Sequence, residues 1–218
     1  MIEAVIFDLD GVLLQSEEVW DEVREQLTRE TGGEWHSRAS RDMMGMSSPE
    51  WSRYMNEKLG LPMTPEAINE EVVRRMELAY ADHLPLISGA REAVHRLAAN
   101  WQLGLASSSN RLLIDRVLQE AELTDLFQAT VSAEEVKRGK PHPEVFQEAA
   151  RRLGVEPSHA AAIEDSHNGV LSAHAADMAV VLFPNVSFPP GEEATALSGA
   201  VVTHLDQLTV ELIQGLDA

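Results

Sequence analysis

The sequence predicts an α/β fold, a doubly wound parallel sheet of the Rossmann-like type with a helical cap subdomain inserted near its start. Six short apolar runs rich in β-forming residues recur along the chain, and helical patterns separate most of them, which is typical of sheets buried on both faces. One long segment, from about residue 17 to residue 83, has only helical signals, although a parallel crossover needs little more than a dozen residues. We therefore expect the core at residues 1–14 and 86–218, and the cap at residues 15–85.

The first strand is expected at Ala4–Phe7, a short and wholly apolar run that Gly11 closes. Five later runs have the same character. They lie at Leu103–Ala106, Ala129–Val131, Ala160–Ile163, Ala179–Phe183 and Val201–Thr203. In open sheets of this kind ligands bind at the carboxyl ends of the strands, so the residues that follow each strand are the candidates for a site.

The helices are expected where apolar residues recur at helical spacing. In the core they are Ala90–Ala99, Leu112–Ala121, Glu144–Leu153 and Val170–Ala175, and in the cap Glu17–Glu30, Pro49–Leu59 and Pro65–Tyr80. In the cap, Ser47-Ser48 and Thr64 stand just before a proline, the usual order of an N-cap and the first helical residue. Pro184 to Gly199 contains three prolines and two glycines and is predicted to be a surface loop.

The charge of the chain limits its partners. It has 36 acidic and 17 basic residues and a formal net charge of −19, which disfavours nucleic acid and anionic membranes as partners. A phosphorylated metabolite would need local positive charge, most simply a metal ion. The chain has no cysteine, so disulfides and thiolate nucleophiles are excluded. No apolar run approaches the ~18 residues of a membrane span, and no basic region precedes the first strand, so we expect a cytoplasmic protein.

The strongest candidate site is Asp8-Leu9-Asp10-Gly11, directly after the first strand. Alternation along the chain places the two aspartates on the same side. Two carboxylates this close either bind a divalent cation or take up a proton. The alternative is a solvated turn, because Asp-Gly is a common turn pair. An EF-hand loop is excluded, because Leu13 stands where that loop requires glycine.

Three further strand ends carry polar residues. Ser107-Ser108 begins a serine tract before a helix, Lys140 lies between prolines and glycine, and Glu164-Asp165 follows a buried strand. Each has an ordinary alternative, namely helix capping for the serines and Asp165, and a solvated surface position for the lysine. The joint pattern favours a functional site over these alternatives, because four successive strand ends carry two aspartates, serine, lysine and two more acids. Such an edge can bind a phosphoryl group at a helix N-terminus and neutralise its charge.

This joint pattern resembles the haloacid dehalogenase superfamily of phosphotransferases, in the branch with a helical cap inserted after the first strand, close to β-phosphoglucomutase and sugar-phosphate phosphatases. The resemblance implies that Asp8 is the nucleophile that forms an aspartyl-phosphate. Asp10 would protonate the leaving oxygen and then activate water. Ser107 and the backbone of Ser108 would bind the phosphoryl oxygens, and Lys140 would neutralise Asp8 and the phosphate.

The resemblance also implies a magnesium cofactor. The side chain of Asp8, the backbone carbonyl of Asp10 and the carboxylate of Asp165 would hold Mg²⁺, with Glu164 supporting directly or through water. These are the hard oxygen ligands that Mg²⁺ prefers. Phosphoryl transfer requires mainly positioning and charge neutralisation, which a metal ion and a lysine provide from two sides.

The expected function is Mg²⁺-dependent hydrolysis of a phosphomonoester, in a small phosphorylated metabolite of the sugar-phosphate class. Asp10 argues against true dehalogenases, which lack an acid there. A phosphomutase of the β-phosphoglucomutase type is the alternative, but Met44 and Ser48 stand where its cap lysine and arginine would be, and Trp20 stands in place of a histidine. A non-enzymatic phospho-acceptor of the receiver type is a remote alternative, because receivers carry their acceptor on the third strand and have no cap.

Within the cap, Trp20, Gly45, Met46 and Ser47 are the expected substrate contacts. A methionine-rich loop with a tryptophan nearby forms an adaptable, partly apolar wall, and the alternative is that these residues form the cap's own small core. Trp51 is expected in that core. The protein is expected to be a monomer or a weak dimer.

Overall fold

The computed structural model describes residues 1–44, 46–185 and 189–216. Six parallel strands form one sheet in the order β3-β2-β1-β4-β5-β6. They are β1 (Ala4–Phe7), β2 (Gln102–Ser107), β3 (Phe127–Ser132), β4 (Ala160–Glu164), β5 (Ala179–Leu182) and β6 (Ala200–Val201). The chain order reverses on either side of β1, so β1 lies between β2 and β4 and its carboxyl end is at the switch point where such sheets bind ligands. The expected α/β class with an inserted helical cap is confirmed.

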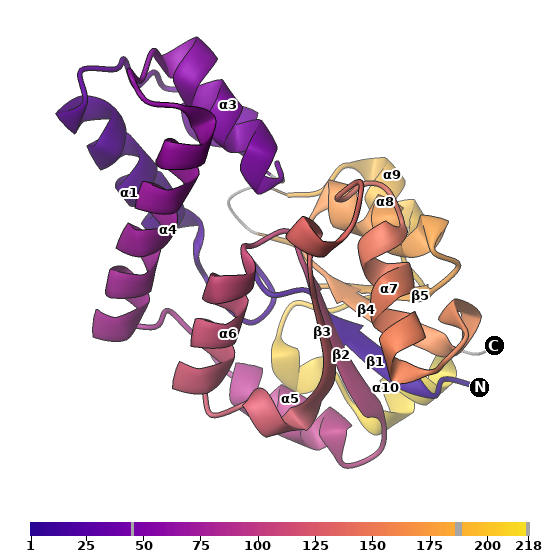
Figure 1. The fold of residues 1–218 in the computed structure, drawn as a ribbon. Helices are drawn as coiled ribbons and strands as arrows, with labels where there is room; N and C mark the ends of the chain where they lie inside the picture. Colours follow the sequence, from indigo (N-terminus) through magenta and orange to yellow (C-terminus); the bar gives the residue numbers. More distant parts are fainter. Residues whose placement is uncertain (45, 186–188, 217–218) are drawn as a thin grey trace.

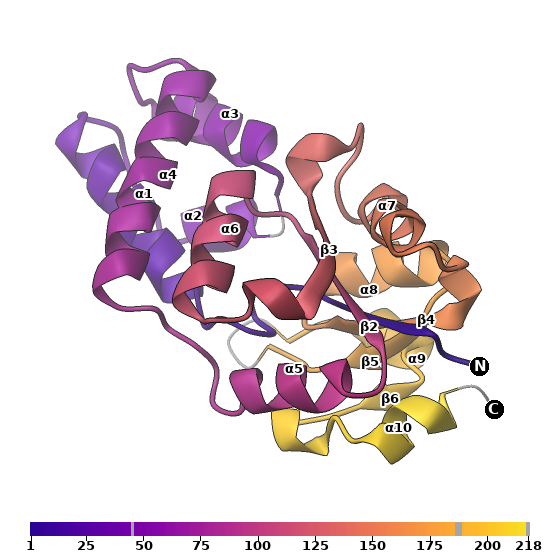
Figure 2. The ribbon, with the colours of Figure 1, turned by 60° about the horizontal axis from the view of Figure 1, so that its bottom comes forward.

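Helices cover both faces of the sheet (Figures 1 and 2). One face packs against α5 (Ala90–Ala98), α6 (Arg111–Glu120) and α10 (Val210–Gly215). The other packs against α7 (Glu144–Leu153), α8 (His167–Ala175) and α9 (Glu192–Leu197). Single 3₁₀ turns join several elements, at η1 (Thr124–Leu126), η2 (Ala133–Glu135), η3 (Pro157–His159) and η4 (Leu205–Gln207). Because β1 is covered on both faces, all four of its residues are buried.

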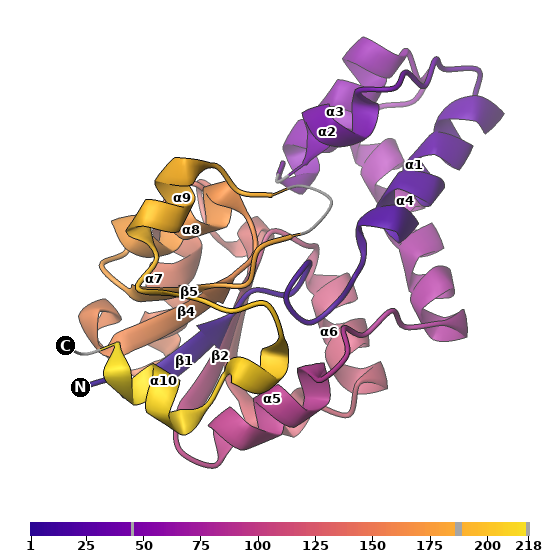
Figure 3. The ribbon, with the colours of Figure 1, turned by 180° about the vertical axis from the view of Figure 1, so that it is seen from behind.

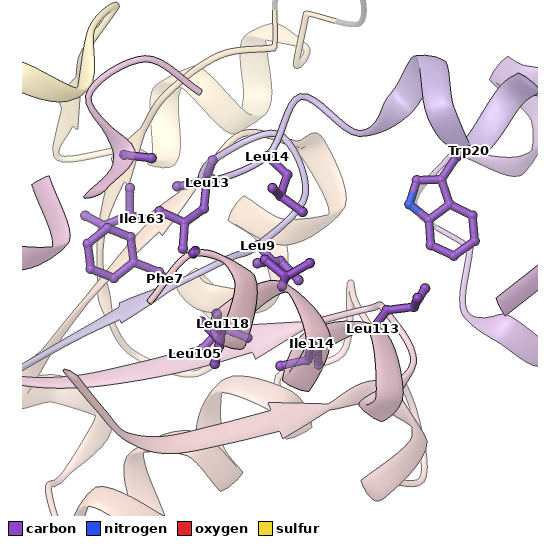
Figure 4. Packing of buried hydrophobic residues seen from close by; sticks show 14 of the residues in the cluster. Phe7, Leu9, Leu13, Leu14, Trp20, Leu105, Leu113, Ile114, Leu118 and Ile163 are labelled. Carbon is purple, nitrogen blue, oxygen red and sulfur yellow. The ribbon is translucent and has the colours of Figure 1, made fainter. Parts of the chain in front are cut away.

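The core beneath the site is a cluster of large aliphatic and aromatic side chains. Phe7 of β1 packs edge-on against Phe127 of β3, with ring centroids 6.0 Å apart. Leu9 lies between the two aspartates in sequence and points into this core, and Trp20 lies at the cap side of the same cluster (Figure 4). Leu9 thus anchors the Asp8–Asp10 segment, while both aspartates line one cavity, which agrees with the alternation.

The cap consists of α1 (Glu17–Glu30), α2 (Ala39–Met43), α3 (Ser48–Leu59) and α4 (Pro65–Asp82), grouped to one side of the sheet (Figures 1 and 3). The two chain crossings that join it to the core lie together, because Gln15 N–H donates to the Pro85 carbonyl at 2.8 Å and Ile87 N–H to the Leu13 carbonyl at 2.9 Å. The α4 helix continues down to pack against α6 of the core. No helix in the described ranges is long and apolar enough to cross a membrane.

The elements differ from the expectation mainly where they are short. The expected surface loop at Pro184–Gly199 contains a helix, α9, and the prediction of a loop there is wrong for Glu192–Leu197. Ala194 of α9 is fully buried, and α9 packs against α8, so tertiary packing outweighs the local loop composition. The short helices α2 and α10 were also not anticipated, and α8 begins three residues earlier than expected, at His167.

Candidate active site

The centre of the site is a buried lysine between two carboxylates. Lys140 Nζ donates to Asp8 Oδ1 at 2.6 Å and to Glu164 Oε1 at 2.5 Å. Asp8 follows β1, Glu164 ends β4, and Lys140 comes from the loop between η2 and α7, so three strand connections meet at one point. The Lys140 side chain is only 5% exposed, and the alternative of a solvated surface lysine is wrong.

Burial and mutual repulsion shift the pKa values of these groups. Removal from water raises the pKa of Asp8 to about 8, with the Lys140 charge opposing this shift and Glu164 and Asp10 adding to it. Burial lowers the pKa of Lys140, but the charges of Asp8 and Glu164 outweigh burial and raise it above its ordinary value. Burial, and then the charges of Glu164 and Asp8, raise the pKa of Asp165 well above its ordinary value. One lysine does not neutralise three buried acids, and the excess negative charge favours a bound cation.

Asp8, Glu164 and Asp165 fit a metal site. Each offers one carboxylate oxygen, and these three oxygens all lie within 4.8 Å of one another. All three residues are buried, and an all-oxygen, acidic donor set suits Mg²⁺. Asp165 was alternatively a candidate helix cap, but Ser166 caps α8 instead, its hydroxyl accepting from Gly169 N–H at 3.1 Å. Asp165 is thus left facing the cluster.

Two glycines leave the space that the metal-site acids occupy. A Cβ added at Gly11, where φ is +84°, would lie 1.9 Å from Oδ2 of Asp165. A Cβ added at Gly169 in the first turn of α8 would lie 1.8 Å from Oε1 of Glu164. Neither contact is possible for a real side chain, so any larger residue would displace a carboxylate.

Asp10 is held as an acceptor by three donors. Its Oδ1 accepts from Ser16 Oγ at 2.5 Å and from Trp20 Nε1 at 3.3 Å, and its Oδ2 accepts from Ser109 Oγ at 2.6 Å. Trp20 belongs to the cap, and Ser109 follows β2. This carboxylate therefore links the cap to the core, and it lines the same cavity as Asp8.

The serine tract divides into two parts. Ser107 is fully buried, and its hydroxyl accepts from the backbone N–H of Ser109 at 3.0 Å. Ser108 and Ser109 line the cavity. The helix cap that follows is Asn110, so the serines are not simple N-caps of α6. The first backbone N–H of α6, from Arg111, donates to Glu134 Oε2 at 2.8 Å and is already occupied.

Asp8, Asp10 and Lys140 line a cavity of about 530 Å³ between core and cap, within the size range typical of small-molecule sites. Its core side includes Asp8, Asp10, Ser108, Lys140 and Asp165. Its cap side is partly apolar. That side includes Trp20, Met43, Met44, Met46 and Trp51 together with Asp21, Arg24, Ser40 and Arg41.

The cap residues expected to contact the substrate differ in whether they line the cavity. Trp20 and Met46 line the cavity. Ser47 caps α3, with its hydroxyl donating to Glu50 Oε2 at 2.6 Å, and is not among the lining residues. Gly45 lies outside the described residues. Trp51 is 2% exposed and belongs to the cap core as expected, yet it also borders the cavity.

Several lining residues escaped the sequence analysis. Arg24, one helical turn after Trp20, is buried at the cavity wall. Asn185 Nδ2 donates to Asp165 Oδ2 at 3.2 Å and also to Glu17, so it joins the metal cluster to the start of the cap. His167, the first residue of α8, also borders the cavity. The four-residue spacing of Trp20 and Arg24 is the one signal in the sequence that could have identified Arg24, because residues at this spacing share a helix face.

The sequence and fold of this chain match known proteins along nearly its whole length. The family model for haloacid dehalogenase-like hydrolases matches residues 2–177. The chain belongs to this family. Hexitol phosphatase B of Escherichia coli (strain K12) is 34% identical over 98% of this chain and 97% of its own length. The phosphorylated carbohydrates phosphatase of Thermotoga maritima is 30% identical over 80% of this chain and 82% of its own length.

Solved structures of haloacid dehalogenase-like proteins show the same architecture. The crystal structure of β-phosphoglucomutase from Clostridium difficile superposes with a TM-score of 0.84 at 25% identity, covering all of this chain and 97% of that one. CbbY from Rhodobacter sphaeroides in complex with phosphate has a TM-score of 0.88 at 22% identity over 98% of this chain and all of its own, a likeness of fold. With its phosphatase relatives, the family membership establishes this chain as a phosphatase of the haloacid dehalogenase type.

Proposed function

We propose that this chain is a Mg²⁺-dependent phosphomonoester hydrolase of a small sugar phosphate, working through an aspartyl-phosphate on Asp8. The observation that carries the proposal is the position of Asp8, which touches Lys140 on one side and lies within the acidic cluster on the other. A phosphoryl group next to Asp8 would have positive charge on both sides once the metal is bound. Residues 15–85 are proposed as the cap and residues 1–14 and 86–218 as the core.

The proposed reaction has two steps. An oxygen of Asp8 attacks phosphorus, the bond to the leaving oxygen breaks, and Asp10 donates a proton to that oxygen. Water then attacks the phosphorus of the aspartyl-phosphate, its proton returns to Asp10, and Asp8 is regenerated with release of inorganic phosphate. A single acid/base therefore serves both steps.

The hydrogen bonds of Asp10 indicate which oxygen carries that proton. Oδ1 meets Trp20 Nε1, an indole group that can only donate. Among the residues that the structure describes, Oδ2 accepts only from the hydroxyl of Ser109, which can rotate and accept instead. We therefore assign the transferable proton to Oδ2.

The remaining groups would bind the phosphoryl group and neutralise its charge. Lys140 would neutralise Asp8 and the incoming phosphate, and Ser107 and the backbone of Ser108 are proposed to bind phosphoryl oxygens, with Ser109 placed to assist because it lines the cavity. Asp8, Asp165 and the carbonyl of Asp10 are proposed to hold Mg²⁺, with Glu164 supporting. Bound Mg²⁺ supplies charge neutralisation for the transferring phosphoryl group.

The substrate class draws support from two relatives. Hexitol phosphatase B and the phosphorylated carbohydrates phosphatase are both named for phosphorylated carbohydrates, and the partly apolar cap wall suits the carbon face of a sugar. A β-phosphoglucomutase-type activity is the second candidate because of the fold likeness. Against it, Ser48, where a mutase carries arginine, is buried with its hydroxyl donating to Asn110 Oδ1 at 2.9 Å.

The test is phosphate release from a panel of hexose, hexitol and pentose phosphates with Mg²⁺, run beside the Asp8→Asn variant. We expect the variant to lose activity by at least about 10³-fold, because the amide is not a nucleophile. Equal phosphate release by the wild type and the variant would show that Asp8 is not the nucleophile. Isomerisation of glucose 1-phosphate without release of phosphate would establish the mutase instead.

A further inference from the structure

Arg24 occupies an unusual position in the cavity wall. It lies on α1 with 8% of its surface exposed, and its guanidinium carbon is 4.5 Å from the ring centre of Trp20 and 4.8 Å from that of Trp51. The two indoles, whose centroids are 6.0 Å apart, pack edge to face against each other, and both contact its planar head group. Such cation–π contacts orient a guanidinium but do not use its N–H donors.

The guanidinium lacks a direct counter-ion within the described part of the chain. Its Nε is buried there without any hydrogen-bond partner, and none of the ion pairs found there involves it. The nearest acids act only at a distance, and burial lowers the pKa of Arg24 to about 10 despite the opposing charges of Asp21 and Asp10. An uncompensated buried cation is costly. An anion neutralises its charge, whereas a neutral hydroxyl only accepts a hydrogen bond from it.

The geometry points to Arg24 as a specificity residue that binds a second anionic group of the substrate, at the end remote from the phosphate that is hydrolysed. Trp20 lies between the reaction centre and Arg24, because its Nε1 donates to Asp10 and its ring contacts the guanidinium of Arg24. Asp10 and Arg24 both line the same cavity, so one small molecule can reach both. In a chain with a net charge of −19, a diacid needs a fixed local cation in order to bind.

This inference rests on the proposed phosphatase activity and narrows its substrate class to phosphorylated sugar acids or sugar bisphosphates. The two share the required chemistry, an anionic oxygen group that accepts from a guanidinium. A neutral polyol phosphate would leave the charge of Arg24 uncompensated in the cavity.

The experiment compares two open-chain substrates that differ only at the remote end, 6-phosphogluconate with a carboxylate and sorbitol 6-phosphate with a hydroxymethyl group. We expect the wild type to have the higher kcat/KM for the acid. In Arg24→Met, the ratio of the two kcat/KM values falls about 30-fold, which corresponds to about 2 kcal/mol. In Arg24→Lys, part of the ratio returns, because the charge remains without the planar fork.

Arg116→Met provides the matched control, because its Nε is also buried without a partner while its head group pairs with Glu120 on α6, outside the cavity. Fructose 1,6-bisphosphate tests phosphate as the second anion, and preference for either diacid over sorbitol 6-phosphate supports the inference. If Arg24→Met lowers kcat/KM for 6-phosphogluconate and sorbitol 6-phosphate equally, or changes neither, Arg24 is only part of the cap packing and the inference is wrong.

Binding measured without turnover distinguishes a failure of the Arg24 inference from a failure of the proposed phosphatase function. Calorimetry with the Asp8→Asn protein should give tighter binding of 6-phosphogluconate than of sorbitol 6-phosphate, and Arg24→Met in the same background should abolish the difference. Equal binding of both compounds would overturn the inference. Failure of the proposed function would instead appear as phosphate release that does not depend on Asp8.

Discussion

The two walls of the cavity are built in different ways. The core wall is the carboxyl edge of a parallel sheet, where Asp8 N–H still donates to the Ile163 carbonyl of β4 at 2.9 Å, so strand register fixes the carboxylates. The cap wall consists of side chains of packed helices and of methionines, which adopt several shapes at little cost. If the proposed function holds, the rigid core wall carries out the chemistry and the adaptable cap wall selects the substrate, so substitutions at the core edge should lower activity far more than those in the cap.

Among substitutions other than that of Asp8, the largest effect is expected at Lys140. Lys140→Met removes the ammonium group that pairs with Asp8 and Glu164, and we expect kcat/KM to fall by about 10²–10³-fold. Steady-state phosphate release measures the fall, and circular dichroism checks that the fold is kept. The exposed Lys137→Met is the matched control. A loss below about tenfold would place Lys140 outside the reaction and weaken the contrast between the walls.

Gly169 tests how precisely the core wall is packed. Gly169→Ala would force a methyl group into the Glu164 carboxylate, and overpacking of this kind costs about 1–3 kcal/mol. We expect a lower melting temperature and weaker activation by Mg²⁺ in titrations of activity against the metal. Gly215→Ala at the end of α10, where a Cβ meets nothing within 4 Å, should change neither. Normal metal activation in Gly169→Ala would show that the edge tolerates displacement.

The pH dependence of stability follows from the raised pKa values. Between the ordinary value of 3.8 and about 8, native Asp8 binds a proton that the unfolded chain has lost. The free energy of unfolding of the metal-free protein should therefore decrease as pH rises through this interval. Mg²⁺ requires the ionised carboxylates, so it should raise the melting temperature more near about pH 8 than near about pH 5.

Thermal melts with Mg²⁺ and with a chelator, at several pH values, measure this effect. Asp8→Asn is the control, and its metal-free profile should be flatter across the same interval. Metal-free stability that rises steadily from about pH 5 to about pH 8 would contradict the charge balance described for the cluster.

The smallest effect is expected from the contact that joins the two walls. Trp20→Phe keeps the ring against Arg24 and loses the 3.3 Å hydrogen bond to Asp10, which Ser16 and Ser109 still hold. One hydrogen bond is worth about 1 kcal/mol, so kcat should fall about fivefold. Trp101→Phe, which loses a 3.1 Å bond to the Ile2 carbonyl away from the cavity, should leave kcat unchanged. A loss as large as that of Lys140→Met would show that the cap takes part in the chemistry.

The contrast between the core wall and the cap wall also explains which site residues the sequence predicts well. Asp8 and Glu164 could be placed together from sequence because the end of a buried strand is visible as the end of an apolar run, and parallel strands end at a common edge. Lys140 lies in the longer connection that follows β3. The metal cluster of Asp8, Glu164 and Asp165 follows from the same rule. Their roles stay predictions until the variants are measured.

The cap wall was harder to predict because it depends on how helices pack. Arg24 and Trp20 were visible as a pair at helical spacing, but which face of α1 borders the cavity is set by its contacts with Trp51 and α4. The α9 helix was missed because six residues among prolines and glycines carry little propensity, and burial of Ala194 stabilises it instead. Long-range packing of this kind has no local signature in the sequence.

The most direct test of the account is to trap the phosphoryl group on Asp8. Acetyl phosphate has a leaving group that needs no proton, so an Asp10→Asn variant should still transfer the phosphoryl group but should lack the base that activates water. Intact-mass spectrometry after rapid mixing with Mg²⁺ should show one added phosphoryl group, and peptide mapping should place it on Asp8. Phosphoryl transfer to another residue, or none while acetyl phosphate is consumed, would contradict the account.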